Sequence, residues 1–136
     1  MAQLNVNISR QPDYSDLDLD FQINPATGDI NKKTGEAAVK RSIRNLIFTN
    51  YYERPFRSFI GSKVPRLLFD NVDLMTATYI EDAIKHLINS FEPRVVLTDV
   101  KVFADFENHG FNIQIQYIII NTETPATFNL FLERIR

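Results

Sequence analysis

The feature that most constrains the fold is a change of hydrophobic period at Pro93. Before it, apolar residues recur every three or four positions, which is typical of one face of an α-helix. This stripe comprises Ala77, Ile80, Ala83, Ile84, Leu87, Ile88 and Phe91. After Pro93, apolar and polar residues alternate, which is typical of strands with one buried face. A helix followed by half-buried strands predicts an α+β domain.

The alternating segments predict a three-stranded antiparallel meander over Val95–Leu132. In the first segment, Val96, Val100 and Val102 are expected on one face, and Leu97, Asp99, Lys101 and Phe103 on the other. A turn at "ENHG" follows, in which Gly110 is expected to supply a positive φ. The second and third segments each place one apolar set on one face: Phe111, Ile113, Ile115, Tyr117 and Ile119, then Phe128, Leu130 and Leu132.

A second main helix is predicted to begin near Thr34, whose hydroxyl can cap the first turn, and to fray near Thr49. Its apolar residues are Val39, Ile43, Leu46 and Ile47. Asp73 or Thr76 is expected to cap the helix that precedes Pro93, and Pro65 to open a short helical turn. The predicted fold is thus two main helices packed on the meander. The alternation of Leu17, Leu19, Phe21 and Ile23 adds a short N-terminal strand or hairpin.

The length of 136 residues predicts one folded domain. Residues 1–16 are polar and are expected to form a flexible arm, and residues 17–136 the domain. The chain has no cysteine, which excludes disulfides and thiolate chemistry. No signal peptide is recognisable at the N-terminus, and the longest apolar run, Tyr117–Ile120, is far too short for a membrane span. A soluble protein is predicted.

Charge is segregated along the chain although the net charge is only −2. Residues 1–31 carry −4, residues 32–66 carry +7 and residues 67–136 carry −5. Segregation of this kind favours oriented contacts with charged partners, whereas nucleic-acid binding calls for a basic total. The alternative is that the charges form solvated faces that average out in the folded molecule.

The sequence offers little for catalysis. His86 and His109 are the only histidines and show no metal-ligand spacing, and no glycine-rich phosphate loop is present. Glu92 is the best candidate for a general acid, but Arg94 is close enough in sequence to hold it ionised. No catalytic residue, metal site or cofactor is therefore predicted.

The unit Glu92-Pro93-Arg94 separates the helix from the first long strand. Proline disfavours the α region for the preceding residue, so the backbone of Glu92 becomes extended and the helix ends. In an extended segment residues i and i+2 project to the same side, which makes Glu92 and Arg94 neighbours. Two interpretations stay open: a local ion pair that finishes the helix, or a docking element for another protein.

Four segments follow one another along the chain: "SDLDLDFQINPATGDI", "AVKRSIRNLIFTN", "ERPFRSFIGSKVPRLLFD" and "FEPRVVLTDVKV". In this order they resemble the gene-25-type baseplate wedge family of contractile tails, which includes proteins of T4-like phages and of type VI secretion baseplates. The resemblance extends from about Ser15 to Phe131. One departure lies in the loop after the first helix, where Tyr52 occupies a position at which the family commonly has glycine.

The resemblance implies a structural wedge subunit that links inner wedge proteins to the first sheath ring and nucleates sheath polymerisation by strand addition. The implied partners are sheath protein, larger wedge proteins and possibly the tail tube or hub, with no nucleic acid and no membrane. The implied location is the virion baseplate, assembled in the cytoplasm of the bacterial host. Two alternatives are a peptidoglycan-degrading lysozyme-like enzyme, and the equivalent subunit of a type VI secretion system or tailocin.

The strand-accepting sheet is expected to be the meander. The predicted partner-binding residues are Glu92, Pro93, Arg94, Arg54, Phe56 and Arg57. A single-faced core cannot absorb every apolar side chain of the strands, so a second, partner-covered face is predicted. Its expected members are Phe103, Ile118, Ile120 and Phe131.

Overall fold

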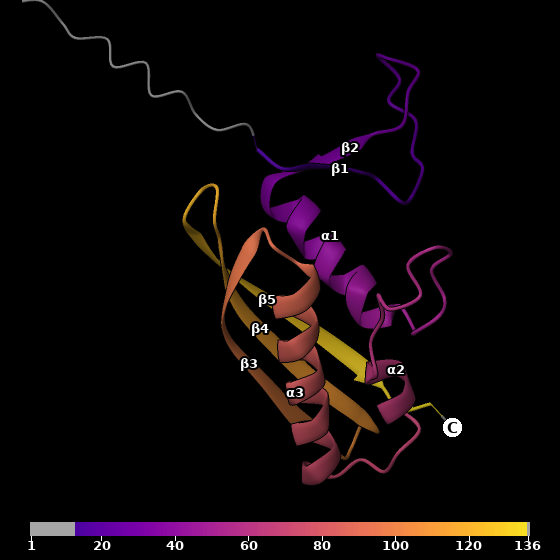
Figure 1. Cartoon of the computed structure of the whole chain (residues 1–136), viewed down its shortest axis with the longest axis vertical. Helices are drawn as coiled ribbons and strands as arrows, with labels where there is room; N and C mark the ends of the chain where they lie inside the picture. Colours follow the sequence, from indigo (N-terminus) through magenta and orange to yellow (C-terminus); the bar gives the residue numbers. More distant parts are fainter. Residues whose placement is uncertain (1–12, 136) are drawn as a thin grey trace, which may run out of the picture.

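A three-stranded antiparallel sheet with helices on one face forms the framework of the molecule, for which the computed structural model describes residues 13–135 (Figure 1). Its strands are β3 (Val95–Asp105), β4 (Gly110–Ile119) and β5 (Thr124–Glu133), in the order β3-β4-β5. β4 is central, so β3 and β5 each pair on one side only. The predicted meander is confirmed.

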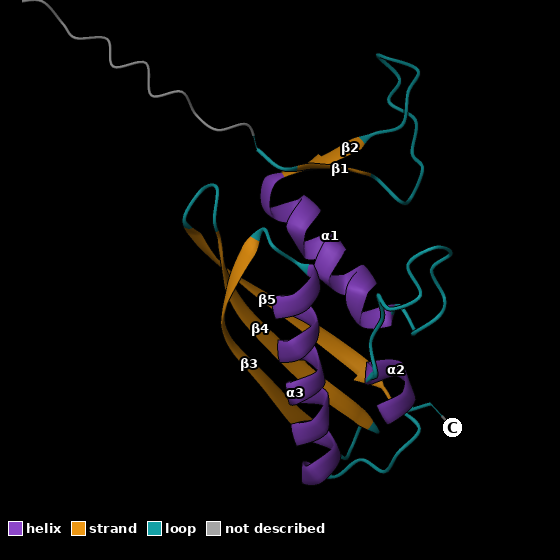
Figure 2. Ribbon diagram, viewed as in Figure 1, coloured by secondary structure: helices purple, strands orange, loops and turns teal. Residues whose placement is uncertain are grey.

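Three helices lie against this sheet: α1 (Gly35–Phe48), α2 (Val64–Leu67) and α3 (Leu74–Phe91), purple in Figure 2. They match the two predicted main helices and the short turn at Pro65. Within residues 13–135, none of the helices has both the length and the apolar character needed to cross a membrane.

The two long helices begin differently. Asp73 caps α3, because its carboxylate accepts a hydrogen bond of 2.6 Å from the Thr76 amide. Thr34 occupies the corresponding position of α1 with extended backbone angles, but its hydroxyl makes no capping bond. The amide of Gly35 donates instead to the Tyr14 carbonyl at 2.8 Å. Thr34 is thus at the predicted N-cap position, but the predicted capping hydrogen bond from its side chain is wrong.

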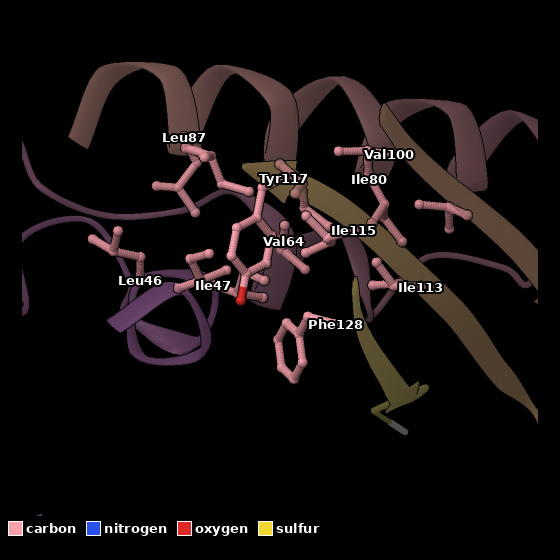
Figure 3. Packing of buried hydrophobic residues seen from close by; sticks show 14 of the residues in the cluster. Leu46, Ile47, Val64, Ile80, Leu87, Val100, Ile113, Ile115, Tyr117 and Phe128 are labelled. Carbon is pink, nitrogen blue, oxygen red and sulfur yellow. The ribbon is translucent and has the colours of Figure 1, made fainter. Parts of the chain in front are cut away.

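The core lies between the helices and the inner face of the sheet (Figure 3). The alternating side chains of β4 are almost fully buried, as predicted: Phe111, Ile113, Ile115, Tyr117 and Ile119. Burying each such side chain contributes about 1.5–3 kcal/mol relative to leaving it in water. The helical stripes and Phe128 of β5 close the other sides of this core.

A β-bulge changes the facing of β3 relative to the prediction. The register against β4 shifts between Leu97 and Asp99, so Thr98 is the extra residue. A bulge inverts the alternation of the residues that follow it. Val95 therefore faces the core before the bulge and Val100 after it, whereas Val96 is 55% exposed. The prediction that Val96 shares a face with Val100 and Val102 is wrong.

The turn between β3 and β4 also differs from the prediction. His109, not Gly110, has the positive φ, at 50°. Gly110 is instead required by close packing, because a Cβ there would lie 2.5 Å from Cζ of Phe131 and 2.6 Å from the Leu132 carbonyl oxygen.

A two-stranded hairpin precedes α1, which confirms the predicted N-terminal element. β1 (Ser15–Leu17) pairs antiparallel with β2 (Lys32–Thr34), and a bridge joins Ile23 to Ile30. The four alternating apolar residues of this region are exposed: Leu17, Leu19, Phe21 and Ile23. Residues 1–12 of the predicted arm lie outside the described residues, and its last two residues, Ser15 and Asp16, belong to β1.

Candidate functional site

Glu92 is at the centre of a buried ionic network. The backbone of Glu92 is extended and ends α3, as the following proline predicts. Its side chain is only 3% exposed. The carboxylate accepts hydrogen bonds from Nε of Arg94 at 2.7 Å, from Nη2 of Arg94 at 3.0 Å and from the Ser42 hydroxyl at 2.5 Å. Glu92 therefore joins the end of α3 to α1.

Arg94 extends this network to the N-terminal hairpin. Its Nη1 donates to both carboxylate oxygens of Asp16, at 2.9 and 3.0 Å. Its guanidinium carbon lies 5.6 Å from the centroid of the Tyr14 ring, within cation–π range. One arginine at the start of β3 thus links α3 with β1.

The electrostatics of the network favour its ionised form. Burial raises the pKa of Glu92, but the hydrogen bonds from Arg94 and Ser42, with the charge of Arg94, outweigh burial and lower the pKa overall. The hydrogen bond with Glu92 is the largest cause that raises the pKa of Arg94. A general acid needs a raised carboxyl pKa, so this geometry does not prepare Glu92 for that role.

The ion pair expected within the Glu92-Pro93-Arg94 unit is present. It also reaches α1 and β1, which local spacing did not predict. Of the three residues only Pro93 is exposed, whereas Arg94 is half-buried. Sequence reasoning missed Ser42 and Asp16, because neither lies near the unit in sequence. The docking role of the unit stays a prediction.

The other predicted contact residues lie on an exposed loop between α1 and α2. Phe56 is fully exposed, and Tyr52 is 85% exposed. Arg54 and Arg57 are also exposed and have no ion-pair partner within residues 13–135. The loop is held by a hydrogen bond of 2.9 Å from the Tyr52 amide to the Ser58 carbonyl. It presents apolar and cationic groups together to solvent.

Tyr52 and Phe56 both have left-handed backbone conformations, with φ of 66° and 65°. Residues other than glycine, asparagine and aspartate rarely adopt this conformation, because the Cβ atom clashes with the backbone. The position at which the resemblance predicted glycine is thus one whose φ suits glycine. Strain of this kind is found where the surrounding structure or a function maintains it.

A groove of about 520 Å³ connects the two groups of predicted residues. Arg54 and Arg57 line it on the loop, and Asp16 and Ser42 line it from β1 and α1. Arg41 adds a further cation to the wall. Phe56 is not part of the lining. The loop arginines and the partners of the Glu92–Arg94 pair therefore border one shared concave surface.

The outer face of the sheet has exposed apolar side chains near both of its ends, within residues 13–135. The predicted outward residues are exposed, and the bulge adds Val96: Val96 55%, Phe103 59%, Ile118 38%, Ile120 51% and Phe131 43%. Phe103 and Phe131, from the two outer strands, line a shallow hollow over β4. Gln114 and Gln116 of β4 lie between the row that contains Phe103 and Phe131 and the row that contains Val96 and Ile118, so the face has two separate apolar groups.

The two edges of the sheet differ in how they are protected. β3 has the bulge at Thr98, and its Asp99 and Lys101 lie 3.6 Å apart as an ion pair. Bulges and charged side chains are common devices against edge pairing. β5 has no charged side chain over residues 126–132. β5 is therefore the edge better suited to accept a strand.

No metal site is evident in the part of the chain that the structure describes: residues 13–135 contain no group of three or more His, Cys, Asp or Glu side chains placed to hold an ion. His86 shares a hydrogen bond of 3.1 Å with Ser90 one turn further along α3. His109 lies in the β3–β4 turn.

Comparison with known proteins decides the family. The model of the family Baseplate wedge protein gp25 matches residues 33–124, which is more than half of the chain. The chain belongs to this family. The family match covers the loop with Arg54 and Phe56, the Glu92-Pro93-Arg94 unit and the first two strands of the sheet.

Relatives of this baseplate wedge protein come from several contractile systems. Baseplate wedge protein gp25 of Enterobacteria phage T4 is 26% identical over 108 residues, which cover 79% of this chain and 81% of that protein. A Geobacter sulfurreducens protein named as a candidate tail lysozyme has 23% identity and a TM-score of 0.65, covering 72% of this chain and 89% of its own.

Two further solved structures share the fold. A chain of the baseplate of the anti-feeding prophage has 21% identity and a TM-score of 0.63, covering 91% of this chain and 88% of its own. A chain of the post-contraction baseplate of pyocin R2 has 20% identity and a TM-score of 0.56, covering 72% of this chain and 96% of its own.

Proposed function

We propose that this baseplate wedge protein is a structural subunit that joins larger wedge proteins to the first sheath ring and starts sheath polymerisation by accepting a strand. The observation that carries the proposal is the edge of β5, which within residues 13–135 pairs with β4 on one side only and has no charged side chain over residues 126–132. An extended segment added there forms main-chain hydrogen bonds with groups that β4 leaves free.

An exposed aromatic side chain on the outer face of β5 supports this role. Phe131 lies on β5 opposite Asn112 of β4, and its side chain is 43% exposed. A strand added at β5 continues this outer face, so its own outward apolar side chains would pack against Phe131.

The predicted partner-binding residues take two roles in the proposal. Arg54, Phe56 and Arg57 are exposed, and they contact an acidic and apolar surface of a larger wedge protein. Glu92 and Arg94 are engaged with Ser42 and Asp16, so they contribute mainly by fixing the hairpin and α1 that wall the groove. Pro93, which is exposed, provides the direct contact of that unit.

We propose further that the subunit is not an enzyme. Although one fold neighbour is named as a candidate tail lysozyme, the lowered pKa of Glu92 favours an ionised carboxylate held by Arg94. Incubating the purified chain with bacterial cell walls tests this point. Release of glycan fragments that is lost in Glu92→Gln, with the fold intact, would establish the hydrolase instead.

Two variants with matched chemistry test strand addition. Thr127→Lys/Asn129→Lys places two cations on exposed positions of β5, and Val96→Lys/Thr98→Lys does the same on β3. We expect the β5 variant to assemble baseplates that lack sheath, and the β3 variant to form full tails, as judged by electron microscopy of the particles. Full tails from the β5 variant would refute addition at β5.

A further inference from the structure

Two cations on α1 stand above the open edge of β5. Lys40 and Arg44 are one helical turn apart, so their side chains project from the same side of the helix. With Lys33 and Arg41 they line a shallow groove of about 220 Å³ whose other wall is Phe128 of β5. Nζ of Lys40 lies 5.4 Å from the centroid of the Phe128 ring.

The charges of Lys40 and Arg44 are not compensated within the described residues. Arg41 forms an ion pair with Asp20 at 2.7 Å, and Lys33 lies 3.7 Å from Asp18. No carboxylate of residues 13–135 pairs with Lys40 or Arg44, whose contacts are with aromatic rings. Both side chains are exposed.

The geometry of a sheet fixes where an added strand would lie. Neighbouring strands are about 4.8 Å apart, and side chains directly opposite one another have Cβ atoms about 4.5–5.5 Å apart. Phe128 faces the helices and is 5% exposed. The residue added opposite Phe128 would therefore also face the helix layer, beneath Lys40. Residues two positions away along the added strand project to the same side.

We infer that the segment added to β5 carries carboxylates at alternate positions on its helix-facing side, which pair with Lys40 and Arg44. The inference rests on the proposed strand addition and specifies the chemistry of the segment that the edge accepts. Main-chain pairing at β5 is indifferent to sequence, whereas the two cations select an acidic strand over a neutral or basic one.

Three synthetic nine-residue peptides serve as probes. In the first, glutamate alternates with valine, and in the other two glutamine or lysine replaces every glutamate. Titration into the 15N-labelled chain measures affinity, and hydrogen exchange of the β5 amides measures pairing at the edge. We expect every peptide that binds to protect the β5 amides from exchange. The glutamate peptide should bind about tenfold more tightly than the glutamine peptide, because it can form two exposed ion pairs with the protein. The lysine peptide should be weakest.

Two charge variants separate this inference from strand addition itself. In Lys40→Gln/Arg44→Gln the preference for glutamate should disappear. The control Lys85→Gln/Lys101→Gln removes the same charge from α3 and β3 and should keep the preference. Equal binding of the glutamate and glutamine peptides, with β5 protected, would overturn the inference and leave strand addition standing. Glutamate binding without protection of β5 would also overturn it, and absence of binding by every peptide would count against both.

Discussion

Replacing Glu92 with Gln should destabilise the fold far more than a surface substitution does. The change keeps the shape of the side chain and removes the charge to which Arg94 and Ser42 donate. It also places the side-chain N–H₂ group, a donor, next to the donor groups of Arg94 and Ser42. Removing one partner of a buried ion pair costs about 3–5 kcal/mol. Because Arg94 keeps Asp16 and its side chain is 20% exposed, we expect about 2–3 kcal/mol here.

Chemical unfolding followed by circular dichroism measures this cost directly. At about 3–5 °C per kcal/mol for a domain of this size, the midpoint of thermal unfolding should fall by roughly 6–15 °C. Asp16→Asn is the matched control, because Asp16 makes the other bond with Arg94 but its side chain is 37% exposed. It should cost less than about 1 kcal/mol. A free energy of unfolding for Glu92→Gln within about 0.5 kcal/mol of the unmodified chain would refute the view that this network holds α1, α3 and β1 together.

Three further predictions concern Glu92, Tyr52 and Tyr117. Because the pKa of Glu92 is lowered in the folded state, its ionised carboxylate stabilises the fold at pH values above the ordinary pKa of 4.5. This stabilisation is lost as the pH falls through the folded-state pKa. In urea titrations at several pH values, the difference in free energy of unfolding between the unmodified chain and Glu92→Gln should therefore shrink below pH 4.5. Tyr52→Gly should be more stable than Tyr52→Ala by about 1 kcal/mol in chemical unfolding, since only glycine relieves a φ of 66°, and equal stabilities would contradict the strain. The buried Tyr117 hydroxyl has no hydrogen-bond partner among residues 13–135, and burial raises the pKa of this phenol to about 12. Tyr117→Phe should thus raise the free energy of unfolding by about 1 kcal/mol, whereas a loss of stability would indicate that the hydroxyl has a partner.

The sequence predicted the elements whose periodicity is long and regular. α3 and β4 are of this kind, because each packs one face against the core over its whole length. The bulge at Thr98 left no such signal, since it depends on how β3 registers against β4. Val96 was misplaced for that reason. The close packing of β5 against Gly110, which requires glycine there, likewise left no local signal.

The candidate site was predictable only in part. The residue types of the Glu92-Pro93-Arg94 unit and its ion pair could be inferred, because i and i+2 neighbours are local. Its links to Ser42 and Asp16 span 50 and 78 residues of sequence, which no local pattern encodes. The exposed outer face was anticipated from apolar residues too numerous for a single core. The position of Lys40 and Arg44 above the edge of β5 could not be predicted, because it depends on how α1 packs over that strand.

The most direct test of the central claim is the structure of the assembled baseplate with its first sheath ring, determined by electron cryo-microscopy. Our account predicts that an extended segment of another polypeptide runs beside β5 and forms main-chain hydrogen bonds along residues 126–132. A map in which that edge faces solvent, or meets its neighbour only through side chains, would contradict sheath nucleation by strand addition.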